Sequence, residues 1–307
     1  MNHASEGPGR ASAIIQPWCA NVAEAWTLFW SEHQRTSRCL ARSPEMCEQL
    51  DAHWKRFAST LAPSAKVIDL GCGSGAVGQA MRSAEPGLHV TGIDIARLPP
   101  FFGTGLDLRG GVRMESLPFP DGSFVAAVSQ FGYEYANTKE AAREIARVLA
   151  PGAPLSLLVH HEQGPILGSL KRHRRVIEGI CGVRVQAAFF AGDAGVLAER
   201  IAVLKREYSN DAVLQAAERE LQTHIGRDET TRLQVWRTFV EVLMPELIML
   251  DSLELCCVEG HTIRDVVEPL TEAFELRPPQ PLRTAAGEPI AWIVEGVQRI
   301  SSIWMNI

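Results

Sequence analysis

Short apolar runs alternate with helical stretches between Lys66 and His161. The runs "KVIDL", "HVTGID", "GGVRMES", "FVAAVSQF" and "APLSLLVHH" have the composition of strands. The stretches "AVGQAMRSA" and "NTKEAAREIARVLA" have the spacing of helices. Strands separated by helices pair in parallel, so this segment predicts a doubly wound α/β sheet.

Helical spacing dominates on both sides of this segment. Trp26, Trp30, Trp54 and Phe57 recur at helical intervals before it, and strand signals nearly vanish from Gly164 to Leu270. "FELRPPQPL" and "PIAWIVEGVQ" then predict two more strands. The predicted fold is a Rossmann-like, mostly parallel sheet of seven strands, with N-terminal helices and a helical insertion before the last two strands.

These patterns divide the chain into four parts. We expect a disordered tail over 1–16, a helical segment over 17–62, a Rossmann-like core formed by 63–163 and 271–300, and a helical insertion over 164–270. The insertion is predicted to be a cap that covers the site and excludes water, and the alternative is the interface of a homodimer.

Composition excludes several classes of protein. The formal net charge is -6, and nucleic-acid binders carry a basic face, so no nucleic-acid partner is expected. The basic run "KRHRR" at 171–175 is either a solvated helix face or a clamp for an anionic substrate. Seven cysteines without a CxxC pair predict neither disulfides nor a metal site. No apolar run approaches the roughly 18 residues of a membrane span, and no secretory signal is visible, so we expect a cytoplasmic protein without a membrane partner.

The stretch "VIDLGCGSGAVG" at 67–78 predicts a strand, a tight turn and a helix. Gly73, Gly75 and Gly78 satisfy G-x-G-x-x-G, the fingerprint of dinucleotide binding, with Asp94 placed to hold a ribose. Asp69, two residues before the first glycine, would repel a pyrophosphate and attract a cation. S-adenosylmethionine carries a sulfonium and an amino group, so the acid-first turn favours it over NAD(P).

Several motifs resemble those of class I S-adenosylmethionine-dependent methyltransferases. "VIDLGCGSG" and "GIDIA" resemble the first two motifs of the family, and "LPFPDGSF" with "RVLAPGAPLSLLV" resembles the small-molecule subgroup that includes ubiquinone and menaquinone C-methyltransferases. The resemblance implies S-adenosylmethionine as cofactor, held as follows: Gly71, Gly73 and Gly75 under the methionine part, Asp69 at its amino group, Asp94 on the ribose hydroxyls, Ile95 on the adenine face and the Met114 backbone N–H at the adenine ring. Arg113 stands where the family often has an acid or amide, and Glu115 is expected to substitute for it.

The loop after the fourth predicted strand reads "SQFGYEYAN". Gln130 and Phe131 are expected to contact the cofactor, and Tyr133 and Glu134 to face the reacting atoms, because loops at the carboxyl ends of strands carry sites. The fifth strand ends in His160 and His161 at the same edge, and imidazole is the natural base near neutral pH. One of these histidines, or Glu134, is predicted to be the general base.

The sequence therefore predicts methyl transfer to an oxygen, nitrogen or carbon nucleophile of a small, aromatic or amphiphilic metabolite, as in natural product biosynthesis. No "NPPY"-like motif follows the fourth strand, which argues against methylation of nucleic-acid amines. Two alternatives remain at this point: an NAD(P)-binding oxidoreductase, and a non-catalytic protein that binds S-adenosylmethionine.

Overall fold

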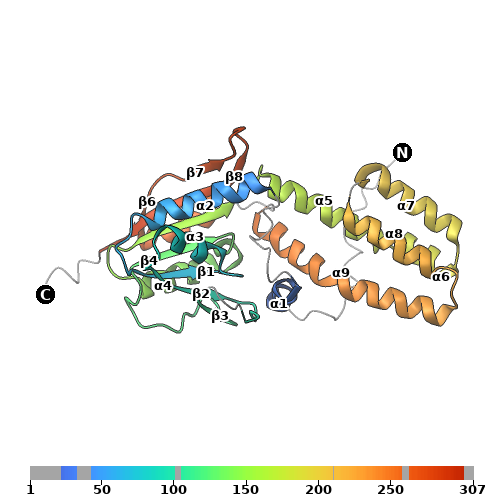
Figure 1. The fold of residues 1–307 in the computed structure, drawn as a ribbon, viewed down its shortest axis with the longest axis horizontal. Helices are drawn as coiled ribbons and strands as arrows, with labels where there is room; N and C mark the ends of the chain where they lie inside the picture. Colours follow the sequence, from blue (N-terminus) through green and yellow to red (C-terminus); the bar gives the residue numbers. More distant parts are fainter. Residues whose placement is uncertain (1–21, 33–42, 101–104, 210, 258–262, 301–307) are drawn as a thin grey trace, which may run out of the picture.

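A mixed sheet lies toward one end of the molecule, and a group of helices extends from it toward the other end (Figure 1). The computed structural model describes residues 22–32, 43–100, 105–209, 211–257 and 263–300, so the predicted tail over 1–16 and parts of 17–62 lie outside the described residues. Seven strands follow the order β3-β2-β1-β4-β5-β8-β6, and β7 pairs with β8 beside this path. Their bounds are β1 Lys66–Leu70, β2 His89–Asp94, β3 Asp107–Gly110, β4 Ala126–Gln130, β5 Pro154–His160, β6 Phe274–Leu276, β7 Gln280–Arg283 and β8 Pro289–Gln298.

The first five strands are parallel, so their carboxyl ends meet at one edge. β8 runs antiparallel beside β5, from Pro154 opposite Val297 to His160 opposite Ala291. In doubly wound sheets, ligands bind beyond the carboxyl ends of the strands. The ends of β1, β2, β4 and β5 are therefore the place to look for a site.

Two strands differ from those predicted. "FELRPPQPL" forms β6 and β7 rather than one strand, and both pair with β8. The two prolines at 278–279 separate them, since proline lacks the N–H that a strand ladder needs. The third strand, β3, begins at Asp107 and ends at Gly110, upstream of most of "GGVRMES". Gly111 follows with φ +74°, a turn conformation, which places Met114 in a loop.

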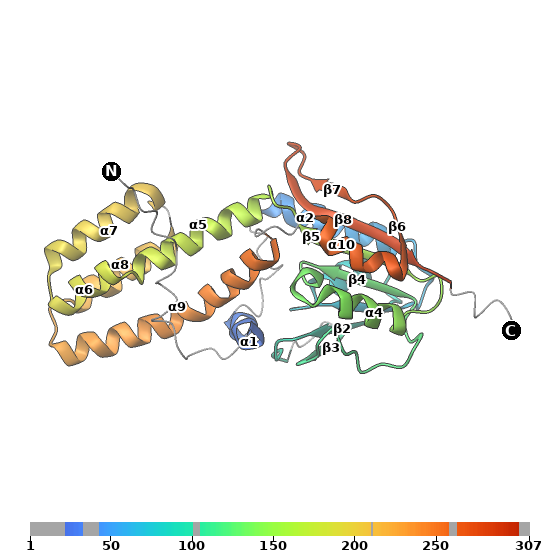
Figure 2. The same cartoon turned by 180° about the vertical axis from the view of Figure 1, so that it is seen from behind.

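Helices cover both faces of the sheet (Figures 1 and 2). α2 (Pro44–Ala58) and α3 (Ala76–Ala84) cover one face, and α4 (Thr138–Val148), α10 (Ile263–Val267) and the 3-10 helix η3 (Glu268–Glu272) cover the other. Each face has its own apolar core, with Trp54 and Val67 in the first and Ile68 and Ile145 in the second. Successive side chains of β1 therefore point to opposite faces of the sheet and contribute to both apolar cores.

The predicted helical insertion forms an arm that projects away from the sheet (Figure 1). Its helices are α5 (Pro165–Ile180), α6 (Val183–Ala191), α7 (Ala194–Tyr208), α8 (Ala212–His224) and α9 (Glu229–Cys257). The distal part has a separate core that includes Phe189, Leu221 and Trp236. α1 (Val22–Glu32) packs against α9 near the sheet. Among the described residues, no helix is long and apolar enough to cross a membrane.

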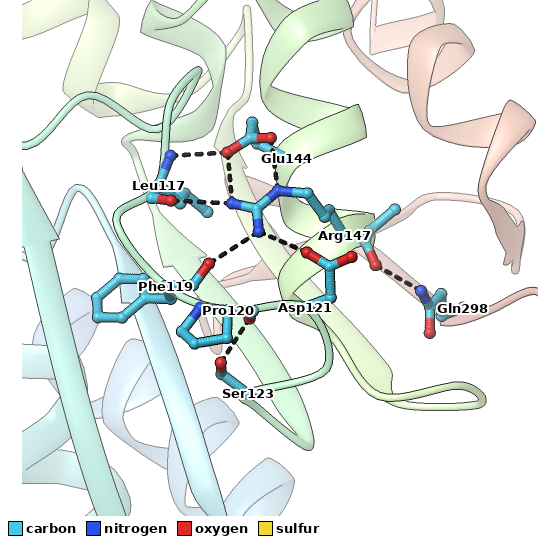
Figure 3. A network of polar contacts seen from close by, with 9 residues as sticks. Leu117, Phe119, Pro120, Asp121, Ser123, Glu144, Arg147 and Gln298 are labelled. Carbon is cyan, nitrogen blue, oxygen red and sulfur yellow. Dashed lines mark hydrogen bonds and ion pairs between the residues drawn. The ribbon is translucent and has the colours of Figure 1, made fainter.

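The "LPFPDGSF" motif is a loop anchored by one arginine of α4 (Figure 3). Arg147 donates to the carbonyls of Leu117 and Phe119 and to the carboxylates of Asp121 and Glu144 at 2.8–2.9 Å. Glu144 also accepts the Leu117 N–H. All five guanidinium N–H donors are used. The motif therefore holds the chain between β3 and β4 in place, and its position in the fold gives it a structural role.

Candidate active site

The turn between β1 and α3 is built from glycines in the left-handed region. Gly71, Gly73 and Gly75 have φ of +71°, +48° and +79°, which other residues rarely adopt. The N–H groups of Gly71 and Cys72 both donate to the Ile93 carbonyl. A Cβ on Gly71 would lie 3.0 Å from the Gly132 Cα, so the turn also packs tightly on the loop after β4.

Asp69 lies on β1 beside this turn and is almost fully buried. Neither carboxylate oxygen has a hydrogen-bond partner among the described residues. Burial, and to a lesser degree the nearby Asp94, raise the pKa of Asp69 to about 8, and the Gly78 backbone N–H partly opposes the rise. A buried carboxylate without a donor within bonding distance is costly, and a cationic ligand would relieve that cost.

Asp94, at the end of β2, is also buried but has backbone partners. Its Oδ2 accepts the Gly73 N–H at 2.9 Å and its Oδ1 accepts the Ala96 N–H at 2.8 Å. Burial raises its pKa to about 6, and these two hydrogen bonds oppose the rise. Asp94 thus ties the glycine turn to the end of β2. Each carboxylate oxygen has a second lone pair, so the same group can accept ribose hydroxyls as well.

Trp30 of α1 covers the glycine turn, and sequence reasoning missed it as a site residue. A Cβ on Gly73 would lie 2.2 Å from Trp30 Cζ2, so the indole ring is in direct contact with the Gly73 backbone. The available signal was the cluster of four tryptophans in the first 54 residues, which also fits ordinary core packing.

The end of β4 turns sharply at Phe131, the position expected to touch the cofactor. Phe131 has φ +55°, which is strained for a residue with a Cβ. Its N–H donates to the Leu158 carbonyl on β5. The preceding Gln130 accepts the Trp54 indole N–H at 2.7 Å, so α2 fixes the side chain of this residue.

Glu134 and His160 form a buried pair at this edge. His160 Nδ1 lies 2.8 Å from Glu134 Oε1, and the same oxygen accepts the His160 backbone N–H. Both side chains are 1% exposed. Among the described residues, His160 Nε2 and Glu134 Oε2 have no partner. The Phe131 ring stacks on the imidazole with centroids 4.2 Å apart, and Tyr135 meets it edge-on. A carboxylate on Nδ1 fixes the tautomer and leaves Nε2 as an acceptor.

Two other predicted catalytic residues, Tyr133 and His161, do not contact the Glu134–His160 pair through any described hydrogen bond or ring contact. Tyr133 is fully buried in the core on the α4 side of the sheet, and its hydroxyl donates to the Thr138 carbonyl. Burial raises its pKa, and the prediction that it acts on the reacting atoms stays a prediction. His161 stacks on Trp292 of β8 with centroids 4.5 Å apart, and its Nδ1 accepts the Gln163 N–H. Adjacent residues of a strand point to opposite faces, which separates His161 from His160.

The three residues expected at the adenine follow the ends of β2 and β3. Ile95 directly follows Asp94 and is half-buried. Met114 approaches Gly71, since its Cε lies 3.9 Å from a Cβ built there. Glu115 Oε1 accepts the Asn137 N–H at 3.0 Å and pairs with Arg113 at 3.2 Å. Glu115 thus links this loop to the start of α4, and its contact with adenine stays a prediction.

The basic run at 171–175 lies on α5 of the arm. His173 is held by Glu246 and Asp211, and Arg174 pairs with Glu178 and Asp251. These ion pairs give His173 and Arg174 partners within the arm. In the part of the chain that the structure describes, no group of three His, Cys, Asp or Glu side chains is placed to hold a metal ion.

Comparison with known proteins assigns the region around the glycine turn. Residues 68–157 match the family model described as a methyltransferase domain. This segment contains the glycine turn, Asp94 and Glu134, and it ends before His160. No curated protein matches the sequence significantly.

Several solved structures are similar to this chain over most of its length. An N-methyltransferase, NodS from Bradyrhizobium japonicum WM9 in complex with S-adenosyl-l-homocysteine, is 12% identical, covers 89% of this chain and 98% of its own, and has a TM-score of 0.43. An S-adenosylmethionine-dependent methyltransferase from Methanosarcina mazei is 21% identical over 80% of this chain and 98% of its own, with a TM-score of 0.39. One from Mesorhizobium loti is 15% identical over 81% and 100%, with a TM-score of 0.41.

These structural likenesses are too distant to carry an assignment, which depends on the family match and on the chemistry of the turn. A buried acid before the glycines suits a cationic ligand such as S-adenosylmethionine better than it suits a dinucleotide. Residues 68–157 match a methyltransferase domain, which supports a methyltransferase activity for the protein.

Proposed function

We propose that the enzyme transfers the methyl group to a nucleophile of a small aromatic or amphiphilic molecule, with Asp69 and Asp94 holding the cofactor. The observation that carries the cofactor site is the buried carboxylate of Asp69, which lies beside a turn made of three left-handed glycines and has no hydrogen-bond partner within bonding distance among the residues that the structure describes. A cation is the ligand that such a carboxylate favours. When bound, S-adenosylmethionine supplies an electrophilic methyl group and a neutral leaving group.

The Glu134–His160 pair is the base that this proposal assigns. Glu134 holds Nδ1, so Nε2 is free to accept a proton from an acceptor hydroxyl or amine. The carboxylate also stabilises the imidazolium that forms. Nε2 lies at the carboxyl end of β5, one strand from the Phe131 turn and two from the glycine turn.

Aromatic rings surround this pair and support an aromatic acceptor. Phe131 and Tyr135 contact the imidazole, and Trp26 meets Tyr135 edge-on with centroids 5.8 Å apart. Offset and edge-on ring contacts stabilise a planar aromatic guest beyond simple burial. An apolar or aromatic acceptor therefore fits this edge better than a strongly charged one.

Only part of the helical insertion is assigned to the cap of the proposed site. The end of α9 nearest the sheet shares a core with Trp26, Trp30 and Phe131, through Leu243, Met244, Leu247 and Leu250. The start of α5 joins the same core through Ile166, Leu167 and Leu170. The distal helices pack on one another instead. We assign the cover to α1 and this end of α9.

Calorimetric titration with S-adenosylmethionine and S-adenosylhomocysteine tests the cofactor site, with Asp94→Asn as the variant expected to lose binding. A screen of phenols, amines and acidic carbon compounds with a labelled methyl donor then tests the acceptor. Absence of heat with either cofactor for the folded protein contradicts the proposal. Methylation confined to proteins or nucleic acids contradicts its substrate class.

A further inference from the structure

Helix α1 contacts three loops of the site at once. Trp30 lies on Gly73 in the loop after β1. Thr27 Oγ1 accepts the Arg97 N–H at 3.0 Å in the loop after β2. Trp26 meets Tyr135 after β4. The helix is therefore docked on the ends of the strands that the cofactor uses.

The contact at Gly73 leaves no space for another molecule. A Cβ at this position would lie 2.2, 2.4 and 2.8 Å from three atoms of the Trp30 ring. Non-bonded carbon atoms need about 3.5 Å, so a ligand atom cannot rest on this face of Gly73 while the ring is there. The glycine turn is the surface on which the methionine part of the cofactor is expected to lie.

We propose that α1 is a displaceable cover, and that Trp30 must leave Gly73 before S-adenosylmethionine binds. The inference rests on the proposed cofactor site, because it places the methionine part on the same face of the turn. Moving α1 also withdraws Trp26 from Tyr135, which uncovers the side of the Glu134–His160 pair. Cofactor binding and access of the acceptor are thereby coupled through one helix.

Packing explains why the covered form is favoured without ligand. Trp26 and Trp30 are 8% and 5% exposed, they stack on each other, and α1 packs against α9. If only the open form binds the ligand, the apparent association constant equals the intrinsic constant multiplied by the fraction of molecules that are open. If about 10% of molecules are open, removing the ring raises the apparent affinity about tenfold.

The first test compares Trp30→Ala with Leu28→Ala in the full chain. Leu28 lies on the same helix but is 39% exposed, so its truncation is the matched control. Binding of S-adenosylhomocysteine is measured by calorimetry, and its association rate by stopped flow. We expect Trp30→Ala to bind about tenfold tighter and to associate faster, and Leu28→Ala to match the wild type.

The outcomes separate this inference from the proposed function. Weaker binding by Trp30→Ala would make Trp30 a fixed wall of the site, and unchanged binding would make it a bystander, so both overturn the inference alone. Failure of the wild type and of both variants to bind overturns the cofactor site itself.

A reversible cross-link keeps the inference testable if Trp30→Ala does not fold. The hydrogen bond between Thr27 and the Arg97 backbone places the two Cα atoms within about 7 Å, which a disulfide can span. In Thr27→Cys/Arg97→Cys, oxidation should lower the affinity for S-adenosylhomocysteine at least tenfold, and reduction should restore it. Each single variant is the control for the native cysteines. Equal affinity of the oxidised and reduced forms, with the cross-link confirmed by mass spectrometry, overturns the inference.

Discussion

Burial of the Asp69 carboxylate lowers the free energy of unfolding of the protein. Within the described part of the chain, its buried carboxylate has no hydrogen-bond partner within bonding distance, while Asp94 nearby accepts two backbone N–H groups. The same burial that penalises the charge in the free protein strengthens its attraction for a cation. Binding sites commonly trade stability for function in this way.

This cost predicts a pH dependence of stability. The folded pKa of Asp69 is about 8, above its ordinary value of 3.8, so the folded state keeps a proton that the unfolded state releases. The contribution of this group to the free energy of unfolding therefore decreases as pH rises from about 4 to about 8, by up to about 1.4 kcal/mol per pH unit. Asp69→Asn should show a shallower decrease in urea denaturation between pH 5 and pH 8, and should lose cofactor binding. Equal slopes for the two proteins would contradict the burial of an uncompensated charge.

The Glu134–His160 pair predicts a separation of binding from turnover. Glu134→Gln keeps the size of the side chain but removes the charge that stabilises the imidazolium, and His160→Gln removes the base. Both should lower kcat by about 10²–10⁴, the range for a lost general base, and leave the affinity for S-adenosylhomocysteine within a factor of about three. Tyr133→Phe is the control, because the Tyr133 hydroxyl donates to the Thr138 carbonyl and its ring belongs to the core on the α4 side of the sheet. A kcat unaffected by either Gln variant would show that the acceptor needs no base here.

At the scale of elements, local signals predicted the glycine turn and its two acids. Strand, acid and glycines follow one another along the chain, so their arrangement needs little tertiary information. Glu134 and His160 were both candidates, but their pairing depends on the register of β4 and β5 and on the η2 turn (Tyr133–Tyr135). That 3-10 turn also directs Tyr133 and Tyr135 into different cores, an outcome that the sequence pattern alone does not reveal.

Other features depend on contacts between distant segments. Trp30 reaches Gly73 because α1 packs against α9, about two hundred residues later in the chain. Helical periodicity shows that one face of α1 is apolar, but not which surface that face covers. β6 and β7 are likewise defined by pairing with β8 rather than by their own short sequences.

The hydrogen bonds of Arg147 to the loop before β4 predict that substitution of Arg147 lowers the free energy of unfolding. Arg147→Lys keeps the charge but loses the planar fork that reaches two carbonyls and two carboxylates. We expect the free energy of unfolding to fall by about 1–3 kcal/mol in urea denaturation, because several partners lose their donor. Arg143→Lys, at an exposed position of the same helix, should change it by less than about 0.5 kcal/mol. Equal effects of the two substitutions would mean that the network adds nothing to stability.

At the scale of the whole molecule, the distal part of the arm has its own apolar core and its own partly buried ion pairs. His173 of α5 lies 2.6 Å from Glu246 of α9 and 3.5 Å from Asp211 before α8. Burial lowers the pKa of His173, but its bonds to these two carboxylates outweigh burial and raise the pKa overall. The stabilisation is therefore complete below pH 6.5 and is lost as pH rises through the folded pKa.

The bonds of His173 to Glu246 and Asp211 predict that the free energy of unfolding of the arm decreases in alkaline solution. Between pH 6 and pH 9 the free energy of unfolding of the arm should fall by about 1–2 kcal/mol, the scale of hydrogen bonds to charged groups. His173→Asn should remove most of this decrease. Trp236 lies in the core of the arm, so its fluorescence follows this unfolding. A variant that keeps the full decrease would assign the pH dependence to other groups.

Separate cores also predict separate unfolding. Phe189 and Trp236 belong to a cluster that contains only residues of the arm, whereas the glycine turn and Asp69 belong to the sheet. A ligand stabilises only the unit whose folded form binds it, so S-adenosylhomocysteine at 100 times its Kd should add about 2.7 kcal/mol to the sheet unit. Phe189→Ala, which removes a fully buried ring, should lower the stability of the arm by about 3–5 kcal/mol and leave cofactor affinity unchanged. Calorimetric unfolding would then show two transitions, one moved by ligand and one by the substitution. A single transition moved by both would mean that α1 and the base of α9 couple the arm to the sheet strongly enough for the molecule to unfold as one, and the cover over the glycine turn would then open only together with the arm.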